Sequence, residues 1–81
     1  MDQPVGKVTH YYDKLGVAIV MFDKEFSSGG KLKFGKTDDA FEQVVESMQF
    51  DHKPIDVAKK GEEVGIKADK VVKQGTPVFL A

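Results

Sequence analysis

The sequence predicts an all-β fold, a small closed barrel of six antiparallel strands with one short helical turn near residues 54–60. Two observations predict it. Apolar and polar residues alternate in short stretches, as at residues 31–36 and 63–68, and this period of two is typical of strands with one wet face. Glycine-bearing turns separate these stretches, and about six short strands joined in this way favour a barrel over an open sheet.

The first two strands are predicted from residue type. Residues 5–12 are rich in valine, threonine and tyrosine, which suit a half-buried pleated surface. Residues 13–16 then form a tight connection, where Gly16 can adopt the positive φ of a hairpin turn. Residues 15–22 are a continuous apolar run, and we expect a strand that is buried on both faces. Three of its residues would line one face: Val17, Ile19 and Met21.

A polar loop and a third strand follow. Residues 23–30 are polar and end in Ser-Ser-Gly-Gly, which predicts a loop. Residues 31–36 alternate, so that Leu32 and Phe34 would face the core and the lysines would face solvent.

Residues 38–50 fit two structures. The polar residues 37–39 could cap a helix. Four apolar residues then fall at the spacing i, i+3, i+4 and i+7: Phe41, Val44, Val45 and Met48. This local pattern favours an amphipathic helix, although it does not decide the question. The alternative is a strand with Val44, Met48 and Phe50 on one face and a bulge at Val45.

The last third of the chain continues the pattern. Residues 54–60 can form one helical turn, which Gly61 would end in a left-handed conformation. Residues 63–68 alternate again, with Val64 and Ile66 facing the core.

A polar turn and one more strand complete the barrel. The turn at residues 69–75 would be anchored by Val71 or Val72. The final strand, residues 77–81, would place Val78 and Leu80 on one face.

Composition limits the classes of function. The chain has 81 residues, no cysteine and a net charge of −1, so we expect one domain, 1–81, without disulfides or thiolate metal sites. All twelve basic residues are lysine. The charge balance argues against a nonspecific nucleic-acid binder, and the absence of arginine removes the forked donor that pairs with phosphate or guanine.

No sequence motif predicts a cofactor or a membrane segment. The chain contains no Gly-x-x-x-x-Gly-Lys-Ser/Thr loop, which excludes a nucleotide site of that type. The first residues lack a basic region followed by an apolar run, and the apolar run 15–22 is far shorter than the roughly 20 residues of a membrane helix. We therefore expect a cytoplasmic protein that binds no nucleotide, no other cofactor and no membrane.

The spacing of small and glycine residues resembles that of a known family, the second domain of the translation GTPases, with elongation factor Tu and the selenocysteine-specific elongation factor nearest in pattern. The similarity covers residues 5–81. It rests on Gly6, Val8, residues 29–34, residues 47–49, residues 52–55, Ala58, Gly61, residues 64–66 and Gly75.

The resemblance implies a β-barrel and therefore a strand, rather than a helix, over residues 42–50. In that family the domain contacts the small ribosomal subunit and, in some members, the aminoacylated end of a transfer RNA. The resemblance therefore implies the same class of partner for this chain, the ribosome or RNA.

Individual residues point to binding rather than catalysis. The two histidines, His10 and His52, have no third metal ligand at useful spacing, and the acidic pairs 38–39 and 62–63 lie in predicted turns, where carboxylates are normally solvated. We therefore expect no enzyme activity and no metal site. The candidate contact residues for RNA or a protein are Tyr11, Tyr12, Lys31, Lys33, Lys36, His52, Lys53, Lys59 and Lys60.

Two functions of different classes remain open. The first is a non-catalytic module that binds RNA or the ribosome; it requires Tyr12, His52 and the lysines to converge on one face. The second is a protein-interaction module, a lid or adaptor for another chain, unrelated to translation. It requires an exposed apolar patch or an unpaired strand edge. A solvated lysine surface that protects a strand edge is the alternative reading of the lysine clusters.

Overall fold

The computed structural model describes residues 3–38, 40–51 and 53–81. Within these ranges all regular secondary structure is β, which confirms the predicted all-β class, and there is no helix that is long and apolar enough to cross a membrane. The strands are β1 (Gly6–Tyr12), β2 (Val17–Phe22), β3 (Phe26–Ser27), β4 (Lys31–Phe34), β5 (Phe41–Val44), β6 (Met48–Phe50), β7 (Lys53–Ile55), β8 (Val57–Ala58), β9 (Glu63–Lys67) and β10 (Pro77–Leu80).

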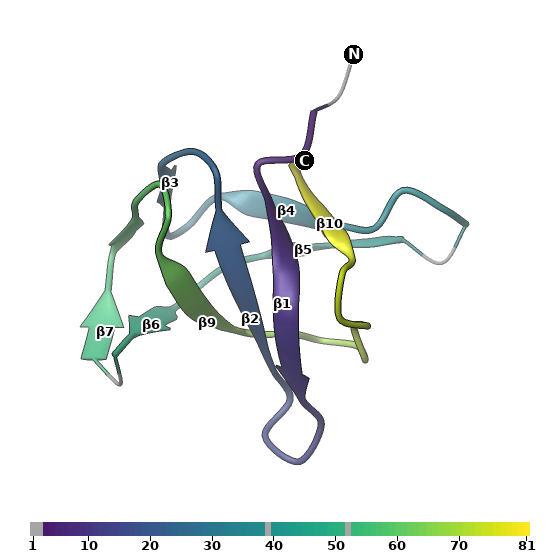
Figure 1. Cartoon of the computed structure of the whole chain (residues 1–81), viewed down its shortest axis with the longest axis horizontal. Coiled ribbons are helices and arrows are strands. Elements are labelled where there is room, and N and C mark those ends of the chain that lie inside the picture. The colour runs from purple at the N-terminus through teal and green to yellow at the C-terminus, as the bar shows by residue number, and fades with distance from the viewer. Residues whose placement is uncertain (1–2, 39, 52) are drawn as a thin grey trace.

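Eight of these strands form one curled antiparallel sheet (Figure 1) in the order β5-β4-β10-β1-β2-β9-β6-β7, while β3 and β8 pair separately. The outermost strands, β5 and β7, are not paired with each other, so the sheet is an open half-barrel. The prediction of a closed six-stranded barrel is therefore wrong. The additional strands are two to three residues long, too short to produce a visible alternation of residue types.

The segment predicted as a helical turn, residues 54–60, instead contains parts of two strands. β7 pairs with β6, and β8 pairs with β3. Pro54 lies in the outermost strand β7, a position where its missing N–H breaks no ladder. The glycine corner is nevertheless present, since Gly61 has φ +85°, and the Glu62 carboxylate accepts a hydrogen bond from the Lys59 N–H at 2.8 Å.

The core lies inside the curl of the sheet and is formed by alternate side chains. On β2 the inward residues Ala18, Val20 and Phe22 are fully buried, and the Phe22 ring stacks on Phe26 at 5.6 Å. The opposite face of β2 is only half-buried, because no other element covers it. The expectation that this strand is buried on both faces is therefore wrong for the isolated chain.

The loop and strand at the C-terminal end also distinguish inward from outward residues. Val72 is buried and anchors the loop at residues 69–75, whereas its neighbour Val71 is 75% exposed. On β10, Val78 enters the core as predicted, but Leu80 is 61% exposed, so these two residues do not share a buried face. Leu80 pairs with buried Leu32 in the last register position of the strand, where the core ends.

Residues 41–50 are extended, so the helix that the local pattern favours is wrong. β5 pairs with β4 at one end of the sheet, and β6 pairs with β9 near the other end. The predicted strand face is also wrong, because Val44 and Phe50 are exposed while Val45 and Met48 are buried. One extended segment thus connects the two ends of the curled sheet.

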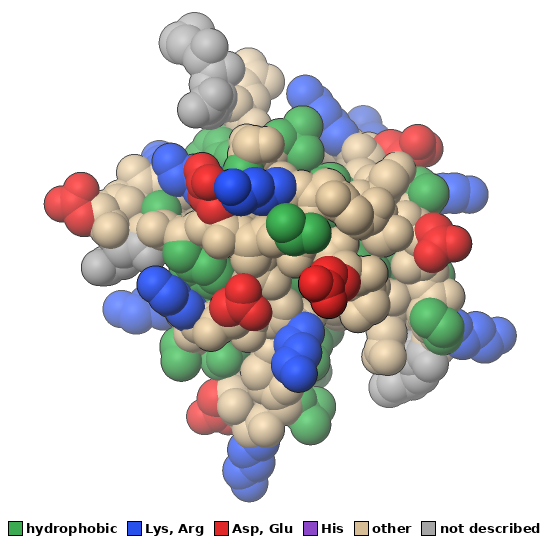
Figure 2. Space-filling model, turned by 180° about the vertical axis from the view of Figure 1, so that it is seen from behind, with side chains coloured by type: hydrophobic (Ala, Val, Ile, Leu, Met, Phe, Trp, Pro, Cys, Tyr) green, Lys and Arg blue, Asp and Glu red, His purple; other side chains and the backbone are tan. Residues whose placement is uncertain are grey.

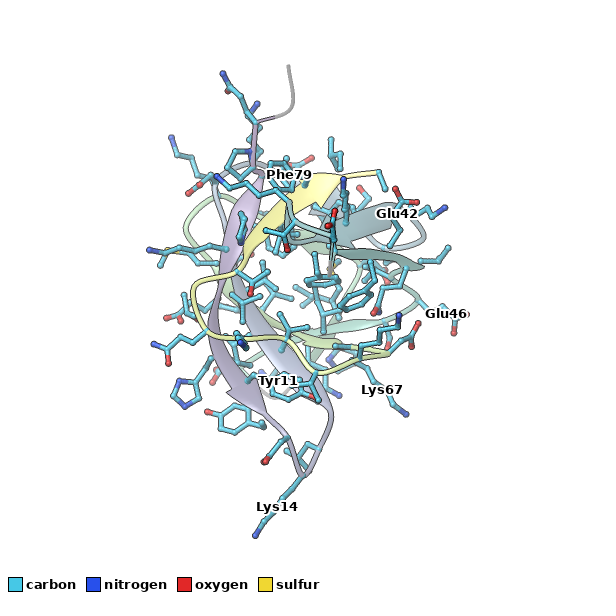
Figure 3. The ribbon with its side chains drawn as sticks, turned by 90° about the vertical axis from the view of Figure 1, so that its right-hand side faces the viewer. Tyr11, Lys14, Glu42, Glu46, Lys67 and Phe79 are labelled. Carbon is cyan, nitrogen blue, oxygen red and sulfur yellow. The ribbon has the colours of Figure 1, made fainter. Side chains whose placement is uncertain are left out.

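A single glutamine joins this segment to β9. Gln43 is the only buried polar side chain among the described residues. Its Nε2 donates to the Lys67 carbonyl at 2.7 Å, and its Oε1 accepts from the Asp69 N–H at 2.8 Å. Figure 3 shows Lys67 on the same side of the molecule as Glu42 and Glu46, two exposed residues of the segment 41–50. The amide therefore satisfies two backbone groups where no strand pairing exists.

We expect Gln43→Glu to lower the free energy of unfolding at pH 7 by about 1–3 kcal/mol, because a carboxylate cannot donate to the Lys67 carbonyl. Protonation restores a donor, so the carbonyl raises the pKa of the introduced carboxyl in the folded state. The deficit relative to the wild type should therefore shrink as the pH falls through this raised pKa, and it should be smallest below the ordinary glutamate pKa of about 4.3. Urea unfolding of both proteins at several pH values measures this difference in the free energy of unfolding.

The exposed Gln49 on β6 offers the matched control. Gln49→Glu should leave the free energy of unfolding within about 0.5 kcal/mol of the wild type at every pH. Equal losses in the two variants would contradict the role given to the Gln43 amide.

Candidate interaction surface

The described residues contain no arrangement typical of a catalytic or metal centre. No three of their His, Asp or Glu side chains are grouped to hold a metal ion. Of the predicted acidic pairs, Glu62 closes the turn described above, and Glu63 accepts a hydrogen bond from the Thr9 hydroxyl at 2.8 Å. Asp38 is exposed in the β4–β5 hairpin, and Asp39 lies outside the described residues. The carboxylates therefore serve turns and strands rather than face one another in a cleft.

The two adjacent tyrosines have different environments. Tyr11 is half-buried and packs against the core. Tyr12 is 46% exposed on the outer face of β1, and its ring lies 5.0 Å from that of His10. Of the two, only Tyr12 offers a free ring surface to a partner.

The predicted lysines are distributed over distant parts of the sheet. Lys31 and Lys33 lie on β4, and Lys36 follows in the β4–β5 hairpin. Lys31 forms an exposed ion pair with Glu42 at 3.2 Å, a contact of about 0–1 kcal/mol.

The other members of the predicted set lie near the opposite end of the sheet. Lys53 is on the outermost strand β7, and Lys59 and Lys60 are at the turn before β9. His52 lies outside the described residues. Figure 2 shows lysine and acidic side chains interspersed over one face of the molecule rather than gathered by sign.

One apolar hollow was missed by the sequence reasoning. A groove of about 440 Å³ lies between the β4–β5 hairpin and the loop before β10. Phe34 and Phe41 stack at 5.2 Å on one side of it, exposed Val71 lies on the other, and the Lys70 ammonium stands 5.8 Å from the Phe41 ring centre. The adjacent pair Val71–Val72 was the available signal in the sequence. One buried valine is enough to anchor the turn, so the second is left on the surface.

The outer face of β2 carries a second apolar surface. Its outward residues Val17, Ile19 and Met21 are half-buried, and Tyr12 pairs with Val17 across the β1–β2 ladder. We call these four residues the outer apolar patch. On the other side of Ile19 the register places Gly65, which adds no side chain. The two strands that carry the patch, β1 and β2, lie at the front of the sheet in Figure 1.

Comparison with known proteins identifies one sequence relative. No protein-family model matches the chain. The chain is 40% identical over 77 residues to an uncharacterized protease of Methanocaldococcus jannaschii; the match covers 94% of this chain and 19% of that protein. The chain therefore spans about a fifth of the length of the curated relative that it matches.

Two solved structures have the same fold. The C-terminal domain of a Geobacillus thermoleovorans protein assigned to the U32 peptidases superposes with a TM-score of 0.90 and 21% identity, covering 98% of this chain and 92% of that one. The selenomethionine variant of that domain gives a TM-score of 0.87 and 21% identity, with coverage of 95% and 98%. These structures share the fold over nearly the whole chain.

These findings overturn the resemblance to translation GTPases. The relative is named a protease, and the matching structures are the C-terminal domain of a peptidase, not the second domain of an elongation factor. The prediction of a translation-factor-like module that contacts RNA or the ribosome is wrong. The glycine and small-residue spacing that carried it, such as Ala58 to Gly65, occurs here in a fold shared with a peptidase domain and therefore does not identify the translation-factor family.

A matched pair of substitutions on β2 can separate the outer apolar patch from the core. Val20→Thr places a hydroxyl in the fully buried core, and we expect it to lower the free energy of unfolding by about 1–3 kcal/mol. Val17→Thr makes the same change on the half-buried outer face, and we expect a change within about 0.5 kcal/mol. Urea unfolding measures both. A larger loss for Val17→Thr would mean that the outer face already supports the isolated fold.

Proposed function

We propose that this chain is an accessory, non-catalytic domain of a U32-type peptidase and acts by contact with the peptidase body. The observation that carries the proposal is the 40% identity to a protease over a segment that makes up only 19% of that protein. A segment of this size, with a fold known as a C-terminal domain, corresponds to one domain of a larger polypeptide.

The chemistry of the surface supports a contact role. The described carboxylates are engaged in turns and strands or stand alone, and no three of these residues could hold a metal. The same chain places apolar side chains on the outside of β2. A domain that provides apolar surface and no reactive cluster fits the lid or adaptor role expected of a protein-interaction module.

A binding experiment tests this function. The 81-residue chain is titrated by calorimetry into the M. jannaschii protease from which the matching 77 residues have been removed. We expect saturable binding with one chain per protease. The intact protease is the control, because its own segment should occupy the site and prevent binding.

The second part of the test concerns catalysis. We expect the isolated chain to leave unfolded casein intact, as measured by the release of soluble peptides. Hydrolysis by the isolated chain would overturn the non-catalytic role, and a failure to bind the truncated protease would overturn the contact role.

A further inference from the structure

We infer that the outer apolar patch is the surface by which this domain docks on the peptidase body, an inference that rests on the proposed function. The four residues of the patch come from the adjacent strands β1 and β2, and the patch borders a third strand, β9. Tyr12 lies beside Val17, and Ile19 lies between His10 and Gly65 in the ladder. A Cβ atom at Gly65 would come within 3.5 Å of the Val17 side chain and 3.6 Å of the Ile19 side chain. These two side chains therefore cover β9 where no side chain of its own projects.

Two other strands of the sheet show the usual pattern. A strand with one solvated face normally alternates apolar and polar residues. β4 does so with outward Lys31 and Lys33, and β9 does so with outward Glu63 and Lys67. β2 alternates only in burial, because both of its faces are apolar. Its sequence is that of a strand covered on both sides, yet this chain covers only one.

Charged side chains surround the patch in the register of the sheet. Met21 lies between Lys7 on β1 and Glu63 on β9, and Val17 lies beside Lys67. An apolar centre with a charged rim is the usual anatomy of a protein interface. The two signs in the rim favour a protein surface of mixed charge over a polyanion.

The size of the patch separates a tethered partner from a second copy of the chain. Three strands about 4.8 Å apart, each contributing about five residues of about 3.4 Å, offer roughly 250 Å² per partner, or roughly 500 Å² in total. Stable complexes of free proteins bury about 1,200–2,000 Å², whereas interfaces between domains of one chain begin near 600 Å². The area of the patch is therefore close to the lower limit for docking within one polypeptide and far below the area of a stable dimer.

The shape of the sheet agrees with this choice. The core fills the inside of the curl (Figure 1), so the outward side chains of β2 belong to the convex side of the sheet. Two convex surfaces make little contact with each other, while a concave surface on a larger body can follow the curvature. Most of the M. jannaschii protease lies outside the segment that this chain matches, and that part supplies a body of sufficient size.

Oxidation by hydroxyl radicals, read by mass spectrometry, tests the surface directly. The free chain is compared with an M. jannaschii protease in which this chain replaces the matching 77 residues. We expect oxidation of Met21 and Tyr12 to be at least about threefold slower in the chimera, because an interface centre excludes solvent. Buried Met48 and exposed Leu80 are internal references whose rates should not change.

Two variants of the chimera make the test specific. Ile19→Asp, in the patch, should return the oxidation of Met21 and Tyr12 to the rate of the free chain. Val44→Asp, which alters a 51% exposed valine on β5, should leave their protection intact. The protection of Met21 in the unsubstituted chimera does not depend on the folding of either variant.

The outcomes distinguish this inference from the proposed function. Protection of other residues, such as Leu80, with Met21 unprotected would overturn the inference and leave the contact role standing. Equal oxidation of every residue in the free chain and the chimera would overturn both. If the chimera does not fold, the free chain is compared with the same chain in the presence of excess truncated protease, and the same protection of Met21 and Tyr12 is expected.

Discussion

The fold depends on one extended segment, residues 41–50, that pairs with β4 at one end of the sheet and with β9 near the other. Because the two halves are joined by only three residues between β5 and β6, the sheet must curl far enough to bring its ends together. The amide of Gln43 completes this closure by bonding to backbone groups of Lys67 and Asp69. The interior of the curl then holds the phenylalanines and valines of the core.

The same segment explains which parts of the fold the sequence could predict. β4 and β9 were predictable because their inward apolar residues alternate with outward residues that are charged or glycine. β2 was predictable because it is a continuous apolar run. In residues 41–50 the inward residues include Gln43 and Val45, so a polar side chain stands where alternation requires an apolar one. Four of the five apolar residues in this segment match helical spacing. Only the hydrogen-bond partners of Gln43, which are distant in sequence, resolve the ambiguity.

The candidate surface was predictable in part. The apolar run at residues 15–22 was apparent, and Tyr12 stood out as a contact residue. Whether the second face of that run is covered depends on a partner outside the chain, and a single sequence does not record it. The arrangement of the lysines could not be predicted for a related reason. Their spacing along the chain suggests clusters, but β4 and β7 belong to different ends of the sheet order, and acidic side chains lie among the lysines in Figure 2.

The position of β10 has a consequence for biosynthesis. The last strand lies between β1 and β4, so the edges of two early strands remain unpaired until the C-terminal residues have left the ribosome. Pairing of β1 with β10 joins residues such as Gly6 and Val78, and contacts this distant in sequence form slowly. A nascent or truncated chain without β10 exposes two open edges, which are sites for aggregation. Messages that stop before the codons of β10 should therefore yield chains that quality-control proteases remove.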